Sequence, residues 1–146
     1  LRLGHITSAE IEKCLDLPVS TLIDSNNLNS KLPHSPGMSK VHYAPRTHAI
    51  LHKSVQACME YKGFTSNDLI IFNSLQEMER LHNLPCMATA LSKEGDLKII
   101  AKSLFGKLHD ADKAKFNQLH LCLNDLNDDL ALAINDRMRR ACAEKT

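Results

Sequence analysis

The sequence predicts a mainly α-helical protein in which each chain contributes one short strand to a dimer. Apolar residues recur every three or four positions along residues 48–82 and 97–141, which is the spacing of amphipathic helices. Residues 40–44 instead alternate between polar and apolar side chains, as a strand does. The 146 residues, 43% of them hydrophobic and 24% charged, have the size and composition of one globular domain.

The N-terminal segment, residues 1–39, is expected to form a small helical pair followed by a linker. Residues 7–24 carry two short helical patterns that are separated by an Asp-Leu-Pro sequence. Residues 25–39 are rich in Asn, Ser, Pro and Gly, which favour turns. We therefore expect no core element in this linker.

Residues 10–22 resemble a helix-turn-helix in which Asp16 takes the place of the turn glycine. Asp tolerates the left-handed conformation that this position requires. The second helix of the motif, residues 19–26, has no Lys or Arg and contains Asp24. Because an acidic helix is repelled by phosphates, we expect the pair to pack on the core.

The alternating segment predicts a strand that lies on an edge or ends early. Val41 and Tyr43 would face a core. Pro45 has no N–H group to donate to a neighbouring strand. Four side chains would face away from the core: Lys40, His42, Ala44 and Arg46.

Two helices are expected to follow the strand. Thr47 can cap a helix over residues 48–62, and Thr65 can cap a second helix over residues 66–82. Asp68 stands where the second residue of a capping box belongs. The second helix is apolar around most of its girth, through Leu69, Ile71, Phe72, Leu75 and Met78. Such a helix needs burial on more than one side, which a dimer interface supplies.

A single strand needs a partner strand, because an isolated one is not stable. The economical partner is the same strand of a second copy, paired antiparallel about a two-fold axis. Residues 63–70, Gly-Phe-Thr-Ser-Asn-Asp-Leu-Ile, resemble the turn of the ribbon-helix-helix family of DNA-binding regulators. The resemblance covers residues 40–83. The alternative is a plain helical hairpin that follows an extended loop.

The resemblance implies an antiparallel ribbon that enters the major groove of operator DNA. By position, the side chains that point at base edges are Lys40, His42, Ala44 and Arg46. The start of the second helix would offer backbone N–H groups to a phosphate, and a nearby lysine would add attraction. These residues are Lys62, Thr65, Ser66 and Asn67.

The last third of the chain is expected to be a helical extension. One amphipathic helix begins near residue 97, and a second, capped by Asp110 or Asp112, carries an apolar seam. The seam comprises Phe116, Leu119, Leu123, Leu126, Leu130, Ile134, Met138 and Ala141. It fits an intramolecular helical bundle or an element that binds a second protein chain. The chain is thus divided into segments 1–39, 40–83 and 84–146.

The charge distribution indicates an anionic partner. The net charge is only +1, but residues 31–62 hold five Lys and Arg against one acid, together with four of the eight His. A local basic patch of this kind fits double-stranded DNA.

Little in the sequence points to an enzyme, a metal or a cofactor. His48 and His52 have a helical spacing for metal ligands, but no third ligand is near. A glycine-rich phosphate loop and a nucleophile elbow are both missing. The five Cys show no CxxC spacing, which fits a reducing, cytoplasmic setting. The apolar runs are too short to span a membrane, and no signal peptide opens the sequence.

The function expected from these features is a sequence-specific transcriptional regulator that binds operator DNA as a homodimer. Regulators of the ribbon-helix-helix family are common on plasmids, so a role in conjugation or plasmid maintenance follows from the resemblance. Three alternatives stay open: a helical coactivator subunit similar to that of the flagellar master activator, a relaxosome accessory protein or antitoxin on the same fold, and a small enzyme or metal-binding protein.

Overall fold

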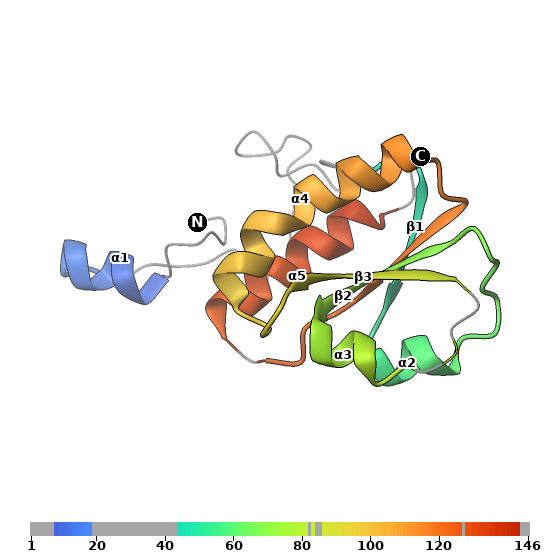
Figure 1. The fold of residues 1–146 in the computed structure, drawn as a ribbon. Coiled ribbons are helices and arrows are strands. Elements are labelled where there is room, and N and C mark those ends of the chain that lie inside the picture. Colours follow the sequence, from blue (N-terminus) through green and yellow to red (C-terminus); the bar gives the residue numbers. More distant parts are fainter. Residues whose placement is uncertain (1–7, 19–43, 82, 84–85, 127, 144–146) are drawn as a thin grey trace.

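The computed structural model describes residues 8–18, 44–81, 83, 86–126 and 128–143, and it has an α/β fold (Figure 1). Its elements follow in the order α1 (Ser8–Leu15), β1 (His48–His52), α2 (Val55–Glu60), β2 (Leu69–Ser74), α3 (Leu75–Glu79), β3 (Met87–Ser92), α4 (Leu97–Ala114), β4 (Gln118–Cys122) and α5 (Asp129–Ala141). The four strands form one sheet. The predicted mainly α-helical fold with a ribbon-helix-helix core is therefore wrong.

Neighbouring strands of the sheet all run parallel, in the order β1-β4-β2-β3. β4 lies between β1 and β2. His48 pairs with Gln118 and His52 with Cys122 on one side of β4, and on its other side Leu119 pairs with Leu69. Because the strands are parallel, their carboxyl ends all lie at the same edge of the sheet.

β1 finds its partner strand within its own chain. Of the strand predicted over residues 40–44, only Ala44 lies among the described residues, and it precedes β1. The intertwined dimer was inferred from a strand with no partner in its own chain. The described residues contain four strands that pair within the chain, so the premise of a single strand that needs a second copy no longer holds.

Helices cover both faces of the sheet. Figure 1 shows α4 and α5 on one face and α2 and α3 on the other. The larger core lies under α4 and α5 and includes Ile71, Leu91, Ile100, Leu104, Leu119, Leu121, Ile134 and Met138. A smaller core under α2 and α3 is formed by Cys58, Ile70, Phe72 and Cys122. Of the two alternatives for the C-terminal helices, the structure shows packing within the chain.

β2 and β4 lie where helices were predicted. β2 is buried at all six of its positions and β4 at four of five. A strand that is buried on both faces has a continuous apolar sequence, which resembles that of a buried helix. The helix predicted over residues 48–62 is likewise replaced by β1 and the short helix α2.

The helix predicted from residue 97 is confirmed as α4. Asp110 and Asp112, predicted as caps of the next helix, lie inside α4. α4 faces the sheet with its buried residues Ile100, Leu104, Leu108 and Ala111. Within the described part of the chain, no helix is long and apolar enough to cross a membrane.

α1 ends where Asp16 takes a left-handed conformation, with φ of 52°. That conformation agrees with its place in the helix-turn-helix resemblance. The second helix of the resemblance, residues 19–26, falls outside the described residues. Figure 1 shows α1 apart from the sheet and the helices that cover it.

Candidate functional site

A helix begins after each of the four strands, at the carboxyl edge of the sheet. In open parallel sheets, ligands bind in the crevice outside this edge. The N-termini of helices also offer backbone N–H groups to anions. The side chains at these four junctions therefore decide what the edge can bind.

The junctions after β2 and β3 satisfy the backbone N–H groups with side chains of the chain itself. Ser74 caps α3, and Glu77 Oε2 accepts hydrogen bonds from Asn73 N (2.9 Å) and Ser74 N (3.3 Å). After β3, Ser92 Oγ accepts from two N–H groups of the following turn, both at 3.1 Å. Asp96 Oδ1 then accepts from two N–H groups in the first turn of α4, at 2.7 and 3.1 Å.

The junctions after β1 and β4 are closed in the same way. Ser54 Oγ accepts from the N–H group three residues further on, at 3.1 Å. Asp128 Oδ1 accepts from Leu130 N at 2.8 Å. Asn135 of α5 holds the loop after β4: its Oδ1 accepts from Asn124 N (2.8 Å), and its Nδ2 donates to Asn124 O (2.9 Å).

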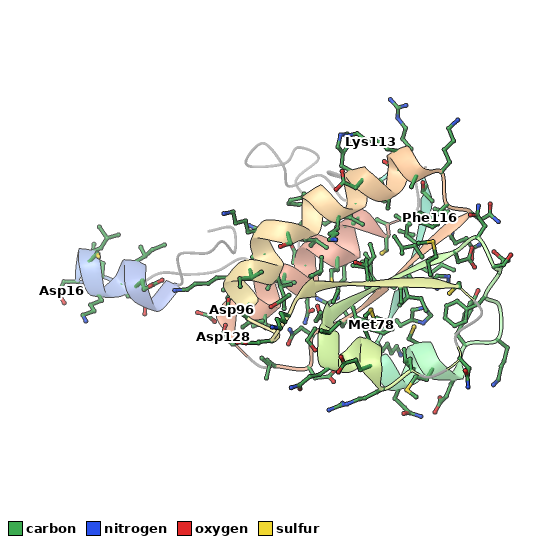
Figure 2. The ribbon with its side chains drawn as sticks, in the orientation of Figure 1. Asp16, Met78, Asp96, Lys113, Phe116 and Asp128 are labelled. Carbon is green, nitrogen blue, oxygen red and sulfur yellow. The ribbon has the colours of Figure 1, made fainter. Side chains whose placement is uncertain are left out.

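The capped edge is a poor site for a phosphate group. Each of the four helix starts already has a side-chain acceptor, and three of these acceptors are the carboxylates of Glu77, Asp96 and Asp128. Figure 2 shows Asp96 and Asp128 at the same end of the molecule, where α4 and α5 begin. Carboxylates repel an anion, so the helix starts that carry them do not favour one.

Asn73 ties the end of β2 to the end of β4. Its side chain is 2% exposed, and its Nδ2 donates to Cys122 O at 3.1 Å. Its Oδ1 has no hydrogen-bond partner among the described residues. A buried, unused acceptor matches a donor such as water, and not an anion.

Two buried histidines lie side by side on the neighbouring strands β1 and β4. His52 Nε2 and His120 Nδ1 are 2.9 Å apart, and the rings are stacked with an interplanar angle of 17°. Asp68 Oδ2 lies 3.7 Å from His120 Nε2, and all three side chains are buried. A carboxylate only accepts. In the protonation state that suits all three groups, the Nε2–H of His120 therefore points toward Asp68. The Nε2–H of His52 donates a hydrogen bond to His120 Nδ1.

Aromatic side chains close over these histidines from the loop between α2 and β2. The ring centroids of Tyr61 and Phe64 lie 5.3 and 4.6 Å from that of His120. Burial, assisted by His52, lowers the pKa of His120 to about 4, although Asp68 acts in the opposite direction. His120 is therefore neutral near pH 7 and has no surface that a dissolved substrate could touch.

Of the residues predicted to read bases, Lys40 and His42 lie outside the described residues. Ala44 is half-buried and Arg46 is exposed, both just before β1. The backbone N of Arg46 donates to Asp112 Oδ2 at 2.8 Å, which fastens this segment to α4. Because β1 belongs to a parallel sheet, these two residues do not lie beside an antiparallel ribbon.

The predicted phosphate contacts lie on the turn before β2. Lys62, Thr65, Ser66 and Asn67 are all exposed there. The pairing of Thr65 with Asp68 is confirmed: Thr65 N and Oγ1 donate to the carboxylate at 2.6 and 2.8 Å. The turn leads into a strand, however, so it offers no helix N-terminus to a phosphate.

His48 and His52 begin and end β1 and do not share a helix face. Four residues along a strand span about 13 Å, which is too far for two ligands of one metal ion. Among the residues that the structure describes, no group of three or more His, Cys, Asp and Glu side chains could hold a metal.

The buried group of His52, Asp68 and His120 was missed by the sequence reasoning. His52 and His120 are 68 positions apart and meet only through the pairing of β1 with β4. One local signal was present. Residues 118–122, Gln-Leu-His-Leu-Cys, alternate in character, so His120 and Cys122 share one face of β4.

Comparison with known proteins overturns the expected regulator. A family model described as threonylcarbamoyl-AMP synthase, C-terminal domain, matches residues 6–143. No curated protein and no solved structure gave a match. Operator DNA, a plasmid role, the coactivator and the relaxosome protein do not fit this family, and its name is that of an enzyme. Because the match covers nearly the whole sequence, the chain belongs to the family of C-terminal domains of threonylcarbamoyl-AMP synthase.

Proposed function

We propose that this chain is the C-terminal accessory domain of an enzyme that makes threonylcarbamoyl-AMP for tRNA modification, and that it supports an adenylate site located elsewhere in that enzyme. The observation that carries the proposal is the family match over residues 6–143. The family is named for a C-terminal domain, so the activity in its name belongs to a larger protein.

The chemistry of the product sets requirements for the site that forms it. Threonylcarbamoyl-AMP joins a carbamoylated amino acid to the phosphate of AMP. A site that forms such a bond needs backbone N–H groups, Lys, Arg or a divalent cation around phosphate oxygens. It also needs these donors to be free when the nucleotide arrives.

The carboxyl edge of the sheet has the opposite character. Its helix starts are occupied by side chains of the chain itself, and the carboxylates of Glu77, Asp96 and Asp128 stand at three of them. The fold therefore supports the proposal in a specific way. It supplies an α/β body whose described helix starts, at the edge where such sheets bind nucleotides, already have side-chain caps.

Titration of this chain with AMP and with Mg²⁺ and ATP tests the proposal. We expect no saturable binding under conditions in which the full-length enzyme binds ATP. Saturable binding with NMR shifts at residues 92–98 or 123–130 would show a nucleotide site on this domain and overturn the accessory role. The full-length enzyme in the same buffer is the positive control.

A further inference from the structure

The face of the sheet under α2 and α3 holds a group of thiols that the proposed function does not use. Cys58 of α2 and Cys122 at the end of β4 are both fully buried in one apolar cluster with Ile70 and Phe72. Cys86 packs against the same cluster from the segment before β3. All of these cysteines are free thiols.

Cys58 and Cys122 belong to the same buried cluster, in which α2 packs against β4. Cys122 and His52 are the two neighbours that favour the ionised form of Cys58, Cys122 more strongly. Together they lower the pKa of the Cys58 thiol to about 6, against the effect of burial. Cys58, together with burial, raises the pKa of Cys122. Cys58 is therefore the member of the pair that ionises first.

The other thiols of the body have no such activation. Burial raises the pKa of Cys86 to about 11 and that of Cys142 to about 12. Cys142 lies on the opposite side of the sheet, against the core under α4 and α5. Because the thiolate is the reactive form of cysteine, we expect Cys58 to be more reactive than Cys86 and Cys142.

A base for Cys58 is built into the sheet beside it. His52 lies 2.9 Å from His120, which in turn faces Asp68 at 3.7 Å. In the protonation derived above, His52 gives its Nε2 proton to His120, so its Nδ1 is left free to accept a proton. His52 is therefore the group that we assign as acceptor of the Cys58 proton, since it also lowers the pKa of that thiol.

We propose that Cys58 and Cys122 are an oxidation site that closes to an intramolecular disulfide when the protein meets a hydroperoxide. The Cys58 thiolate attacks one peroxide oxygen, the O–O bond breaks, and the leaving oxygen takes the proton held by His52 to form water or an alcohol. The Cys122 sulfur then attacks the Cys58 sulfenic acid, an S–S bond forms, and the hydroxyl leaves as water with the Cys122 proton. Two thiols are oxidised and one peroxide is reduced. This inference stands independently of the proposed function.

Access to the pair requires a local opening, because neither thiol has exposed surface. α2 is the element that has to move. It has six residues, a single buried side chain, Cys58, and a side-chain cap from Ser54 alone. Short elements with few buried contacts open at low free energy. The oxidation rate should therefore rise in mild denaturant while the overall fold persists.

The test is peroxide treatment of the folded chain, followed by alkylation of free thiols, intact mass and peptide mapping. We expect two thiols to disappear together and a linked peptide pair that contains Cys58 and Cys122. A stable mono-oxidised Cys58, or a Cys58 pair with Cys86 or Cys14, would overturn the proposal. This readout uses the unaltered protein, so it does not depend on the folding of any variant.

Variants then separate the roles of the residues. Cys58→Ser and Cys122→Ser should each prevent the linkage, whereas Cys142→Ser should leave its rate unchanged. His52→Gln should slow the oxidation by about tenfold for each unit by which the thiol pKa rises, and it should move the pH midpoint of the rate upward. An unchanged pH profile in His52→Gln would contradict the role of His52 as the base.

Discussion

His120 is one of two described residues with a buried side-chain polar atom that lacks a hydrogen-bond partner. The imidazole has no exposed surface, and its Nε2 has no hydrogen-bond partner within the described residues. Burial lowers its pKa from 6.5 to about 4. Between pH 6.5 and pH 4 the His120 imidazole is protonated in the unfolded chain but neutral in the folded chain. The free energy of unfolding therefore falls as the pH drops through 6.5, and it levels off below pH 4.

Lowering the pH from 7 to 4 should therefore remove about 3 kcal/mol of unfolding free energy through His120 alone. His120→Asn keeps an acceptor near the position of Nδ1 but cannot titrate. We expect urea unfolding of this variant to show a pH dependence that is flatter by about that amount. His109→Asn, at an exposed position of α4, is the matched control and should keep the slope of the parent chain. Equal slopes in parent and His120→Asn would contradict the account of His120.

At the scale of single elements, the helices with an exposed face were predictable and the strands in the middle of the sheet were not. α4 shows buried Ile100, Leu104 and Leu108 on one side and charged residues on the other. Leu69–Ser74 of β2 is buried throughout, so it lacks the alternation of polar and apolar residues by which a strand is recognised. Its partners are β3 and β4, which lie further along the chain, so only the fold distinguishes it from a helix.

The candidate site was less predictable than the elements. The Thr65–Asp68 pairing is local and was predicted from a four-residue spacing. His52 and His120 meet through parallel strands that are far apart in sequence, and neither residue type nor spacing encodes that register. Each helix cap could have been predicted from its local sequence. That all four caps lie at one edge of the sheet follows only from the order and direction of the strands.

The loop between β4 and α5 offers an element-scale prediction. Asn135 is 6% exposed and makes two hydrogen bonds to the backbone of Asn124. Asn135→Ala leaves that partly buried backbone without its partners and should lower the unfolding free energy by about 1 kcal/mol. Asp136→Ala breaks only a partly exposed pair with Arg140 and should change it by less than about 0.5 kcal/mol. Urea unfolding of both variants checks this, and equal losses would argue against the Asn135 clamp.

At the scale of the whole molecule, the sheet joins parts of the sequence that looked separate. β1 and β2 come from residues 40–83 and β3 and β4 from residues 84–146, yet they form one layer. The strand that suggested a second copy of the chain was predicted over residues 40–44, of which only Ala44 is described, and the four observed strands pair with one another within the chain. Of the basic residues and histidines in residues 31–62, those that the structure describes belong to β1 or to the segments beside β1 and α2, and not to a ribbon. The family match identifies this body as a member of the family of C-terminal domains of threonylcarbamoyl-AMP synthase.

We propose that this α/β body is required for the synthesis of threonylcarbamoyl-AMP and that the nucleotide is held elsewhere in the enzyme. The most direct measurement is product formation and ATP binding by the full-length enzyme with two matched changes. Leu121→Asp places a charge in the fully buried centre of β4, and Leu126→Asp places one at a 56% exposed position of the following loop. A buried unpaired charge destabilises the domain strongly, whereas an exposed one does not.

The account predicts that Leu121→Asp loses most of the synthesis while the enzyme still binds ATP, and that Leu126→Asp keeps both. Retained ATP binding also shows that the rest of the enzyme has stayed folded. Full synthesis in Leu121→Asp would contradict the claim that the domain is required. Joint loss of synthesis and ATP binding, with ATP binding by this chain alone, would contradict the claim that the nucleotide is held elsewhere.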